Sequence, residues 1–471
     1  MGELVIRGRR VVTEHSVAPA SVHISQGRIS AISDYDDVPE GCELLEAAPH
    51  SVVMPGLVDT HVHVNEPGRT DWEGFETATR AAAAGGVTTI IDMPLNSIPA
   101  TTTLAGFEEK LAAAQGRLTV DVGFWGGVVP GNTGELEKLW RAGVVGFKCF
   151  LIHSGVDEFP NVTEKDLLEA MPELARLGAP LIVHAEVPGP VEACCQSMAG
   201  DSSRSYDTFL RSRPREAENE AVFQMIMLAR ETRCKIHIVH HSSADALPVI
   251  RRAKYFGLAL TAETCPHYLH FAAEDIPDGA TEFKCCPPIR ERENREQLWE
   301  ALRDGTLDFV VSDHSPCPPE MKLREQGDFM KAWGGISSLQ LRLPIMWTEA
   351  RARGFSLEHL AKWLCSAPAR QIGFHVLKGS IRKEADADIV IWNPEAEFRV
   401  TPEMIQHRHK LTPYLGETLR GVVEKTFVSG QIVYDNGEFV RSRLGRMILR
   451  GEDCLEAGYR PPPSRNENGG Q

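Results

Sequence analysis

The sequence has no long apolar run and no cluster of basic residues. No apolar stretch approaches the roughly 20 residues that a helix needs to cross a bilayer. The formal net charge is −15, and no lysine- or arginine-rich segment interrupts it. Such a charge repels the phosphates of nucleic acids and of anionic membranes. We therefore expect a small-molecule substrate, and neither nucleic acid nor a membrane as partner.

The sequence also lacks the signs of secretion. Its eleven cysteines are an odd number without the regular spacing of a disulfide framework. The first residues, MGELVIRGRRVV, contain no signal-peptide core, and the last three form no peroxisomal tripeptide. A reducing compartment follows: we expect the cytoplasm, with the peroxisome and the mitochondrion as alternatives. The polar tail, 451–471, is expected to be disordered.

Short segments with alternating apolar and polar residues stand at both ends of the chain, at 1–53 and 376–450. This alternation is typical of small antiparallel strands. The length of 471 residues suits one large domain with a smaller module beside it. We therefore predict a small β-sandwich domain that is built from both chain ends and is split by the segment 54–375.

In that middle segment, apolar β-branched runs alternate with segments rich in alanine, leucine and glutamate. Eight such runs predict a parallel sheet closed into a (β/α)8 TIM barrel, an α/β fold. An open doubly wound sheet is the alternative, but no Gly-x-Gly-x-x-Gly follows the first strand to support it. The expected strands are 57–64, 87–93, 118–128, 144–151, 180–185, 235–241, 257–264 and 308–313. The expected helices include 72–84, 104–115, 164–176, 216–231, 244–255 and 293–303.

The first expected barrel strand carries two histidines, His61 and His63, at alternate positions. Side chains of a strand alternate between its faces, so both rings project to one side and toward one end. Two imidazoles held in this way form half of a divalent-metal site. A pair of core histidines bonded to each other explains the same pattern, and His-x-His alone does not decide between the two.

Further polar residues stand where later strands end, which is where barrels of this kind carry their chemistry. They are His184 on strand five, His240 and His241 on strand six, and Asp313 on strand eight. These residue types are common ligands of divalent transition metals. Together with the first pair of histidines, they favour a metal site over a histidine core.

Strand four ends with a lysine, Lys148, between Phe147 and Phe150. Burial among aromatic rings disfavours an ammonium and lowers its pKa. A neutral amine can react with carbon dioxide to give a carbamate, whose two oxygens could bridge two metal ions. Taken alone, the lysine favours simple pairing with a carboxylate at the barrel mouth. The neighbouring histidines and Asp313 favour the carbamate.

This set of residues resembles the metal site of the binuclear amidohydrolase superfamily, and the resemblance covers nearly the whole chain. Within the superfamily, 263–269 (ETCPHYL) and 284–290 (KCCPPIR) look like the strand-seven and following-loop signatures of the cyclic-amide hydrolases. Four longer runs, 61–75, 146–151, 154–160 and 312–321, are similar to the allantoinase group. These motifs are long, so a chance match is a poor explanation.

The resemblance implies two divalent metal ions and a homotetramer. Zinc is the expected metal, with cobalt, iron, manganese and nickel as alternatives. By position, the more buried ion would be held by His61, His63, N6-carboxylated Lys148 and Asp313, and the more exposed one by Lys148, His184 and His240. His240 is chosen over His241 from the family pattern His-x-Ser and from strand alternation. His241, His237, His267, His270 and His314 are expected to be structural or to support the ligands.

The implied reaction is hydrolysis of a ring amide by a hydroxide bridged between the metals, with Asp313 moving the proton. Dihydroorotase relatives carry an arginine at the position of Asn65, so a neutral ring such as allantoin, opened to allantoate, is favoured here. Each proposed substrate contact could equally cap a loop: Asn65, Asn96, His153, Cys286 and Ser315. Hydantoinase or dihydropyrimidinase activity is the alternative, and a non-catalytic dihydropyrimidinase-related scaffold is a third reading.

Overall fold

The computed structural model describes residues 4–198, 200–441 and 443–451. Apart from Gly451, the tail that was predicted to be disordered lies outside these residues. Within them, none of the helices combines the length and the apolar character that crossing a bilayer requires.

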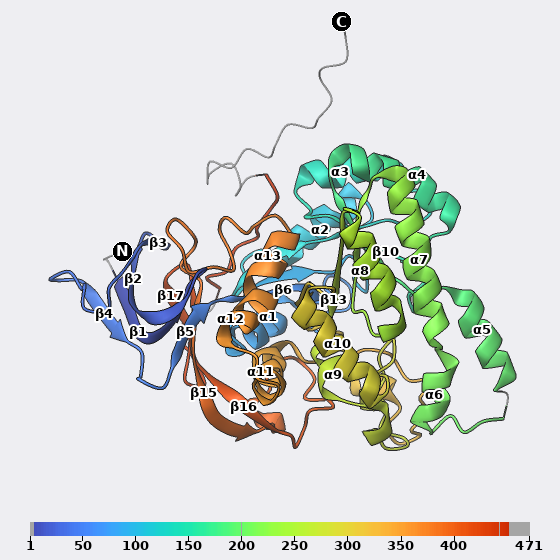
Figure 1. Ribbon diagram of the computed structural model, residues 1–471. Helices are drawn as coiled ribbons and strands as arrows, with labels where there is room; N and C mark the ends of the chain where they lie inside the picture. The colour runs from blue at the N-terminus through green and yellow to red at the C-terminus, as the bar shows by residue number, and fades with distance from the viewer. Residues whose placement is uncertain (1–3, 199, 442, 452–471) are drawn as a thin grey trace, which may run out of the picture.

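The middle of the chain forms a closed barrel of parallel strands, which confirms the predicted α/β fold (Figure 1). Parallel pairing runs from the first barrel strand to the last, and the third position is divided between two short strands. The barrel closes where Val62 pairs with His314, and the His63 amide donates a 2.9 Å hydrogen bond to the His314 carbonyl. The strands are β6 (Leu57–Val62), β7 (Val87–Asp92), β8 (Asp121–Phe124), β9 (Gly126–Gly127), β10 (Phe147–Phe150), β11 (Pro180–His184), β12 (Lys235–Ile238), β13 (Leu260–Thr264) and β14 (Phe309–Val310).

Helices surround this barrel (Figure 1). β6 and β7 are buried along their whole length, as strands covered on both sides must be. The end signals of the helices are local: α4 begins with a capping box between Thr163 and Asp166 and ends at Gly178, whose φ is 71°. The helices are α1 (Phe75–Ala84), α2 (Leu104–Ala114), α3 (Thr133–Ala142), α4 (Glu164–Leu177), α5 (Pro188–Ser197), α6 (Tyr206–Ser212), α7 (Arg215–Thr232), α8 (Leu247–Tyr255), α9 (Pro266–His270), α10 (Arg292–Asp304), α11 (Arg342–Ala352), α12 (Leu357–Ala361) and α13 (Ala367–Gln371).

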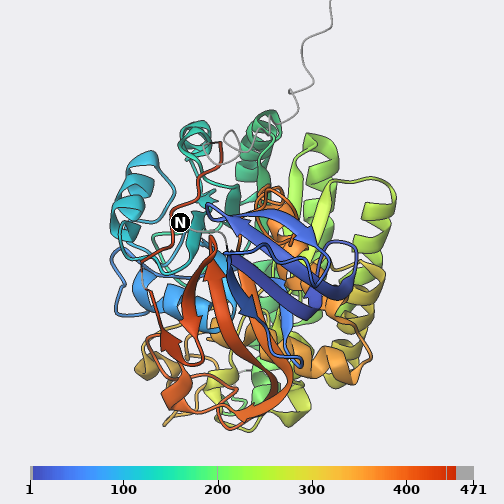
Figure 2. The same ribbon diagram turned by 90° about the vertical axis from the view of Figure 1, so that its left-hand side faces the viewer.

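Strands from both chain ends join in one sheet beside the barrel (Figure 2). Antiparallel pairing of β5 with β15 unites the two ends, with Val390 opposite Met54. Apolar side chains from both ends, including Ile6 and Phe427, share one cluster. The boundaries predicted for this module, at residues 53 and 376, stay a prediction. Its strands are β1 (Leu4–Val12), β2 (Val17–Ser25), β3 (Arg28–Ser33), β4 (Glu43–Glu46), β5 (Val52–Pro55), β15 (Ile389–Arg399), β16 (Thr418–Val428), β17 (Gln431–Asp435) and β18 (Glu438–Phe439).

A buried lysine connects the sheet to the barrel. Lys378 is 1% exposed, and its Nζ lies 2.5 Å from Asp121 of β8, 2.9 Å from Asp386 and 2.7 Å from Asp388. Asp386 and Asp388 precede β15, so one ammonium holds carboxylates from both parts of the molecule. A buried charge is stable only when it is paired in this way.

Candidate metal centre and active site

Three of the expected ligands meet where the barrel closes. His61 lies near the end of β6, His63 just beyond it, and Asp313 follows β14. His61 Nε2 is 3.1 Å and His63 Nε2 is 3.6 Å from the same oxygen, Asp313 Oδ1. One possible ligand atom from each residue lies within 4.8 Å of the others, and all three residues are buried. Because β6 and β14 are neighbours only in the closed barrel, closure creates this cluster.

The other expected ligands stand on the adjoining strands. Nδ1 of His184, the last residue of β11, is 3.0 Å from Nε2 of His240, which follows β12. The His61 and His240 rings are 5.3 Å apart, which joins the two groups. Lys148 of β10 is completely buried; its Nζ lies 4.8 Å from the centroid of the Phe150 ring and has no hydrogen-bond partner among the described residues.

The protonation states suit metal binding. Burial lowers the pKa of His61, His63, His184 and His240, so these rings are neutral at pH 7. Burial alone would raise the pKa of Asp313, but the adjacent histidines hold it well below its usual value. Burial also lowers the pKa of Lys148 to about 8. Neutral imidazoles and an ionised carboxylate are the forms that bind metals, so these residues fit a divalent-metal centre.

Backbone strain gathers around this cluster. His240 and Asp313 have φ values of 37° and 45°, and the nearby Asn65 and Asn96 have φ values of 66° and 63°. Non-glycine residues adopt this left-handed conformation at a cost, and such positions cluster at functional sites. All four residues follow the carboxyl end of a barrel strand, so the strained positions lie at one rim of the barrel.

Two buried carboxylates that the sequence analysis did not identify orient the histidines. His61 Nδ1 donates a 2.7 Å hydrogen bond to Glu263 of β13, and His184 Nε2 donates a 2.8 Å bond to Glu186. Such bonds fix the tautomer and leave the other ring nitrogen free for a metal. Glu186 stands two residues after His184, the same spacing as the first histidine pair, and this signal could have identified it.

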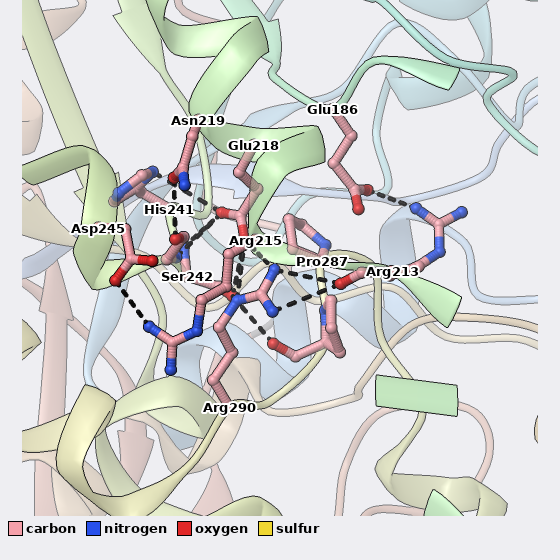
Figure 3. A network of polar contacts seen from close by, with 12 residues as sticks. Glu186, Arg213, Arg215, Glu218, Asn219, His241, Ser242, Asp245, Pro287 and Arg290 are labelled. Carbon is pink, nitrogen blue, oxygen red and sulfur yellow. Dashed lines mark hydrogen bonds and ion pairs between the residues drawn. The ribbon is translucent and has the colours of Figure 1, made fainter. Parts of the chain in front are cut away.

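An arginine then neutralises one of these carboxylates. Arg213 Nη1 donates a 2.6 Å hydrogen bond to Glu186, and the two groups are drawn together in Figure 3. Burial opposes ionisation of Glu186, but Arg213 and His184 outweigh it and lower its pKa to about 2. Arg213 lies in the loop between α6 and α7, and no sequence pattern marks it.

His240 and its neighbour His241 face different surroundings. His241 Nδ1 is 3.8 Å from Glu218 of α7 (Figure 3), whereas His240 Nε2 lies 3.0 Å from His184 Nδ1. Glu218 also accepts hydrogen bonds from the Ser242 amide, at 3.0 Å, and from Arg290 Nη2, at 2.6 Å. This network holds the turn after β12 against α7 and against the loop that contains Arg290.

The remaining histidines have other partners. His237 Nδ1 is 2.8 Å from Thr261 Oγ1, and His270 Nδ1 is 2.7 Å from Glu349. His314 Nε2 is 3.4 Å from Glu73. His267 differs, because it lies with Cys265 and Asp313 in a second group that is compact enough to hold an ion.

A cavity of about 280 Å³ opens above the ligand cluster. Of the expected substrate contacts, Asn96, His153, Cys286 and Ser315 line it. Asn65 does not: its side chain is buried and donates a 3.3 Å hydrogen bond to the Pro316 carbonyl. The described lining also contains cations that the sequence analysis did not anticipate: Arg213, Lys284 and Lys331.

Comparison with known proteins gives a consistent result. The model of the amidohydrolase family matches residues 52–433. An allantoinase of Streptomyces avermitilis is 49% identical over 449 residues, which cover 95% of this chain and 99% of that protein. An allantoinase of Saccharomyces cerevisiae is 47% identical over 409 residues, covering 86% and 88% of the two chains.

The chain is also similar to solved structures. The L-hydantoinase (dihydropyrimidinase) of Arthrobacter aurescens superposes with a TM-score of 0.90 at 32% identity, covering 96% of this chain and all of the other. The dihydropyrimidinase of Brevibacillus agri superposes with a TM-score of 0.86 at 28% identity, covering 95% and 99%.

Proposed function

The chain belongs to the amidohydrolase family, and on that basis we propose that it hydrolyses the ring amide of allantoin to give allantoate. One observation carries the proposal: the family's expected ligand types converge on a cavity at the carboxyl ends of the barrel strands. The identity of 49% over 95% of the chain to an allantoinase supports the choice of substrate.

We propose that two divalent metal ions, zinc in the first place, are held by the residues expected from the sequence: His61, His63, Lys148, His184, His240 and Asp313. When bound, the ions would supply an activated water and polarise the substrate carbonyl. Lys148 would be N6-carboxylated: its neutral amine adds to the carbon of carbon dioxide and loses a proton. The buried Nζ without a hydrogen-bond partner among the described residues supports this modification.

The chain's own groups then orient the ligands and move the proton. Glu263 and Glu186 keep the His61 and His184 tautomers fixed through hydrogen bonds of 2.7 and 2.8 Å. Asp313 is ionised, so it can accept the proton of the attacking water and pass it to the leaving amide nitrogen. Ser315 Oγ lies 3.0 Å from Asp313 Oδ1 and holds that carboxylate in place.

The test is a comparison of kcat/KM for allantoin, hydantoin, dihydrouracil and dihydroorotate with the same metal-loaded preparation. We expect allantoin to be the best substrate and dihydroorotate to be hydrolysed negligibly. Dihydroorotate gives the sharpest comparison, because two features of the chain bear on it in opposite directions. Asn65 stands where dihydroorotases carry an arginine, so that arginine is missing here. Three other cationic side chains, however, line the cavity: Arg213, Lys284 and Lys331. Dihydroorotate turnover comparable with that of allantoin would contradict the proposal.

A hydantoinase or dihydropyrimidinase is the second candidate, because the superposed structures carry those names. The same four substrates distinguish it, since it requires hydantoin or dihydrouracil to exceed allantoin. A non-catalytic scaffold is the third, and it predicts protein that purifies without stoichiometric metal.

We further propose a homotetramer in the cytoplasm. The described cysteines are all free thiols, which supports a reducing compartment. A relative from Aquarana catesbeiana is named a mitochondrial allantoinase, so the mitochondrion stays the alternative. Cell fractionation with an antibody against this chain distinguishes the two.

A further inference from the structure

Asp313 belongs to two groups of possible metal ligands, and the expected metal centre uses only one of them. The second group contains Cys265 and His267. One possible ligand atom from each of its three residues lies within 4.8 Å of the others, and all three residues are buried. Asp313 lines the active-site cavity, whereas Cys265 and His267 are not among the described lining residues. The second group therefore adjoins the carboxylate but not the cavity.

The end of β13 brings Cys265 and His267 together. Cys265 continues the extended backbone of the strand, with φ −126° and ψ 154°, and stands two residues after Glu263. Alternation therefore puts its thiol on the same side of the strand as the Glu263 carboxylate, which bonds His61. α9 begins directly after Cys265, with Pro266 as its first residue, and this turn places His267 beside the thiol.

His267 is the residue that points to a ligand. Both of its ring nitrogens are buried, and neither has a hydrogen-bond partner in the described part of the chain. Leaving a buried polar group without a partner is costly, so such a group calls for an explanation. Burial lowers the pKa of His267 to about 4, although Asp313 opposes the shift. The ring is therefore neutral at pH 7 and can offer a lone pair to an ion.

The three ligand types suit an ion that has affinity for sulfur. Zinc binds thiolate, neutral imidazole and carboxylate, and it accepts three protein ligands with a fourth position open. His61, His63 and Ser315 all contact Oδ1 of Asp313, so Oδ2 can serve the second group.

Binding at this group has a proton cost. Burial raises the pKa of the Cys265 thiol well above its usual value, so the free group is protonated. The sulfur forms its bond to the ion as its proton leaves to solvent. We therefore expect this site to be weaker than the metal pair and to fill only when the ion is in excess.

We propose that Cys265, His267 and Asp313 form a third metal site, which binds a divalent ion with affinity for sulfur, such as zinc in excess. We expect occupancy to inhibit the enzyme, because the ion competes for the carboxylate that accepts the proton of the attacking water. The inhibition rests on the proposed function, whereas the binding of the ion does not.

Cobalt tests the binding, because the ligands proposed for the metal pair contain no sulfur. Co²⁺ added to the full-length protein, with its metal content measured beforehand, should give the near-ultraviolet charge-transfer band of a cobalt–thiolate bond. Cys265→Ser should abolish this band. Cys286→Ser is the matched control, because it removes the thiol that lines the cavity, and it should keep the band.

A second variant tests the imidazole. His267→Asn should raise the Co²⁺ concentration that gives half of the maximal band by at least about tenfold, since loss of a group that merely supports a ligand already weakens metal binding about 10–100-fold. Unchanged Zn²⁺ content of the metal pair shows that the variants are folded.

Cadmium, which prefers sulfur ligands, tests the inhibition. The initial rate of allantoin hydrolysis is measured against free Cd²⁺ and is expressed relative to the rate of the same protein without Cd²⁺. Cys265→Ser should raise the Cd²⁺ concentration for half-inhibition by at least about tenfold. Cys286→Ser should leave that concentration unchanged. Equal inhibition of the wild type and Cys265→Ser would overturn the inhibitory role.

The binding has its own contrary outcomes: a wild-type protein without the sulfur band, or a band that Cys265→Ser leaves intact or Cys286→Ser removes. If Cys265→Ser does not fold, X-ray absorption at the cobalt edge of Cys286→Ser decides. One sulfur ligand on the added cobalt supports the site, and none refutes it. A protein that shows the band but does not hydrolyse allantoin would refute the proposed function and leave the third site standing.

Discussion

At the scale of the residue, the proposed function gives Asp313 two tasks, holding a metal and moving a proton. Asp313→Asn separates them, because asparagine keeps one oxygen and also tolerates the left-handed backbone, where φ is 45°. It cannot accept a proton from water. General acid–base help is worth roughly 10²–10⁴-fold, so kcat should fall by at least that factor while KM changes little. The measurement is steady-state allantoin hydrolysis together with the metal content of the same preparation. A metal-replete variant with near wild-type kcat would contradict the proton-transfer role and would show that Asp313 acts only as a metal ligand.

Lys148 makes a different prediction, because its proposed carbamate would join the two ions. Lys148→Ala should lose tight binding of the metal pair, with partial recovery of activity when short carboxylic acids are added. Metal content after dialysis is the measurement. Lys284→Ala is the matched control: burial lowers the pKa of that lysine, too, to about 8, but its Nζ donates to the Met330 carbonyl at 3.1 Å. Two metals and full turnover in Lys148→Ala would refute the bridging role.

At the scale of the element, one buried ion pair connects a helix, a strand end and a loop. Arg290 donates to Glu218 of α7 at 2.6 Å, and Glu218 accepts the Ser242 amide beyond β12 (Figure 3). Both side chains are 2% exposed. The turn that holds His240 therefore depends on a contact outside its own strand.

Arg290→Met should strongly destabilise this region, because it leaves the Glu218 carboxylate buried without its cation. Breaking a buried pair costs about 3–5 kcal/mol. Thermal unfolding should show a clear decrease in Tm. The control is Arg292→Met, whose pair with Asp275 has side chains 51% and 58% exposed and contributes at most about 1 kcal/mol. Equal Tm values for the two variants would show that the buried network does not hold the loop.

At the scale of the whole molecule, Lys378 joins the sheet made from both chain ends to the barrel. Lys378→Met keeps the volume but leaves three buried carboxylates, those of Asp121, Asp386 and Asp388, without the ammonium. We expect a loss of about 3–5 kcal/mol at neutral pH, seen as a lower Tm. Lys138→Met, which removes a largely exposed pair with Glu135, should change little.

The loss of stability in Lys378→Met should depend on pH. Burial already raises the pKa of Asp388 to about 6 in the presence of Lys378, and removing the ammonium raises it further. A carboxyl whose folded-state pKa exceeds its unfolded value destabilises the fold fully above the folded-state pKa, and this penalty decreases as the pH falls from there toward the unfolded pKa. The Tm deficit of Lys378→Met should therefore be smaller near pH 5 than near pH 8. A deficit that grows as the pH falls would contradict this account.

The barrel and the convergence of its polar residues could be predicted from the sequence, because both follow from local periodicity. Alternation places His61 and His63 on one side of a strand, and parallel strands end at one rim of a barrel. These rules need only neighbouring residues along the chain. For the same reason the apolar runs between helical segments were sufficient to predict the fold class.

Other features were decided only by the tertiary structure, because they depend on contacts between segments that are distant in sequence. Barrel closure sets Asp313 beside His61, and the path of the loop after α6 brings Arg213 to Glu186. Asn65 was expected from its sequence position to contact the substrate, yet the turn after β6 directs its side-chain amide to the Pro316 carbonyl instead of the cavity. Loop conformations satisfy many long-range contacts at once, and no periodicity in the sequence records them.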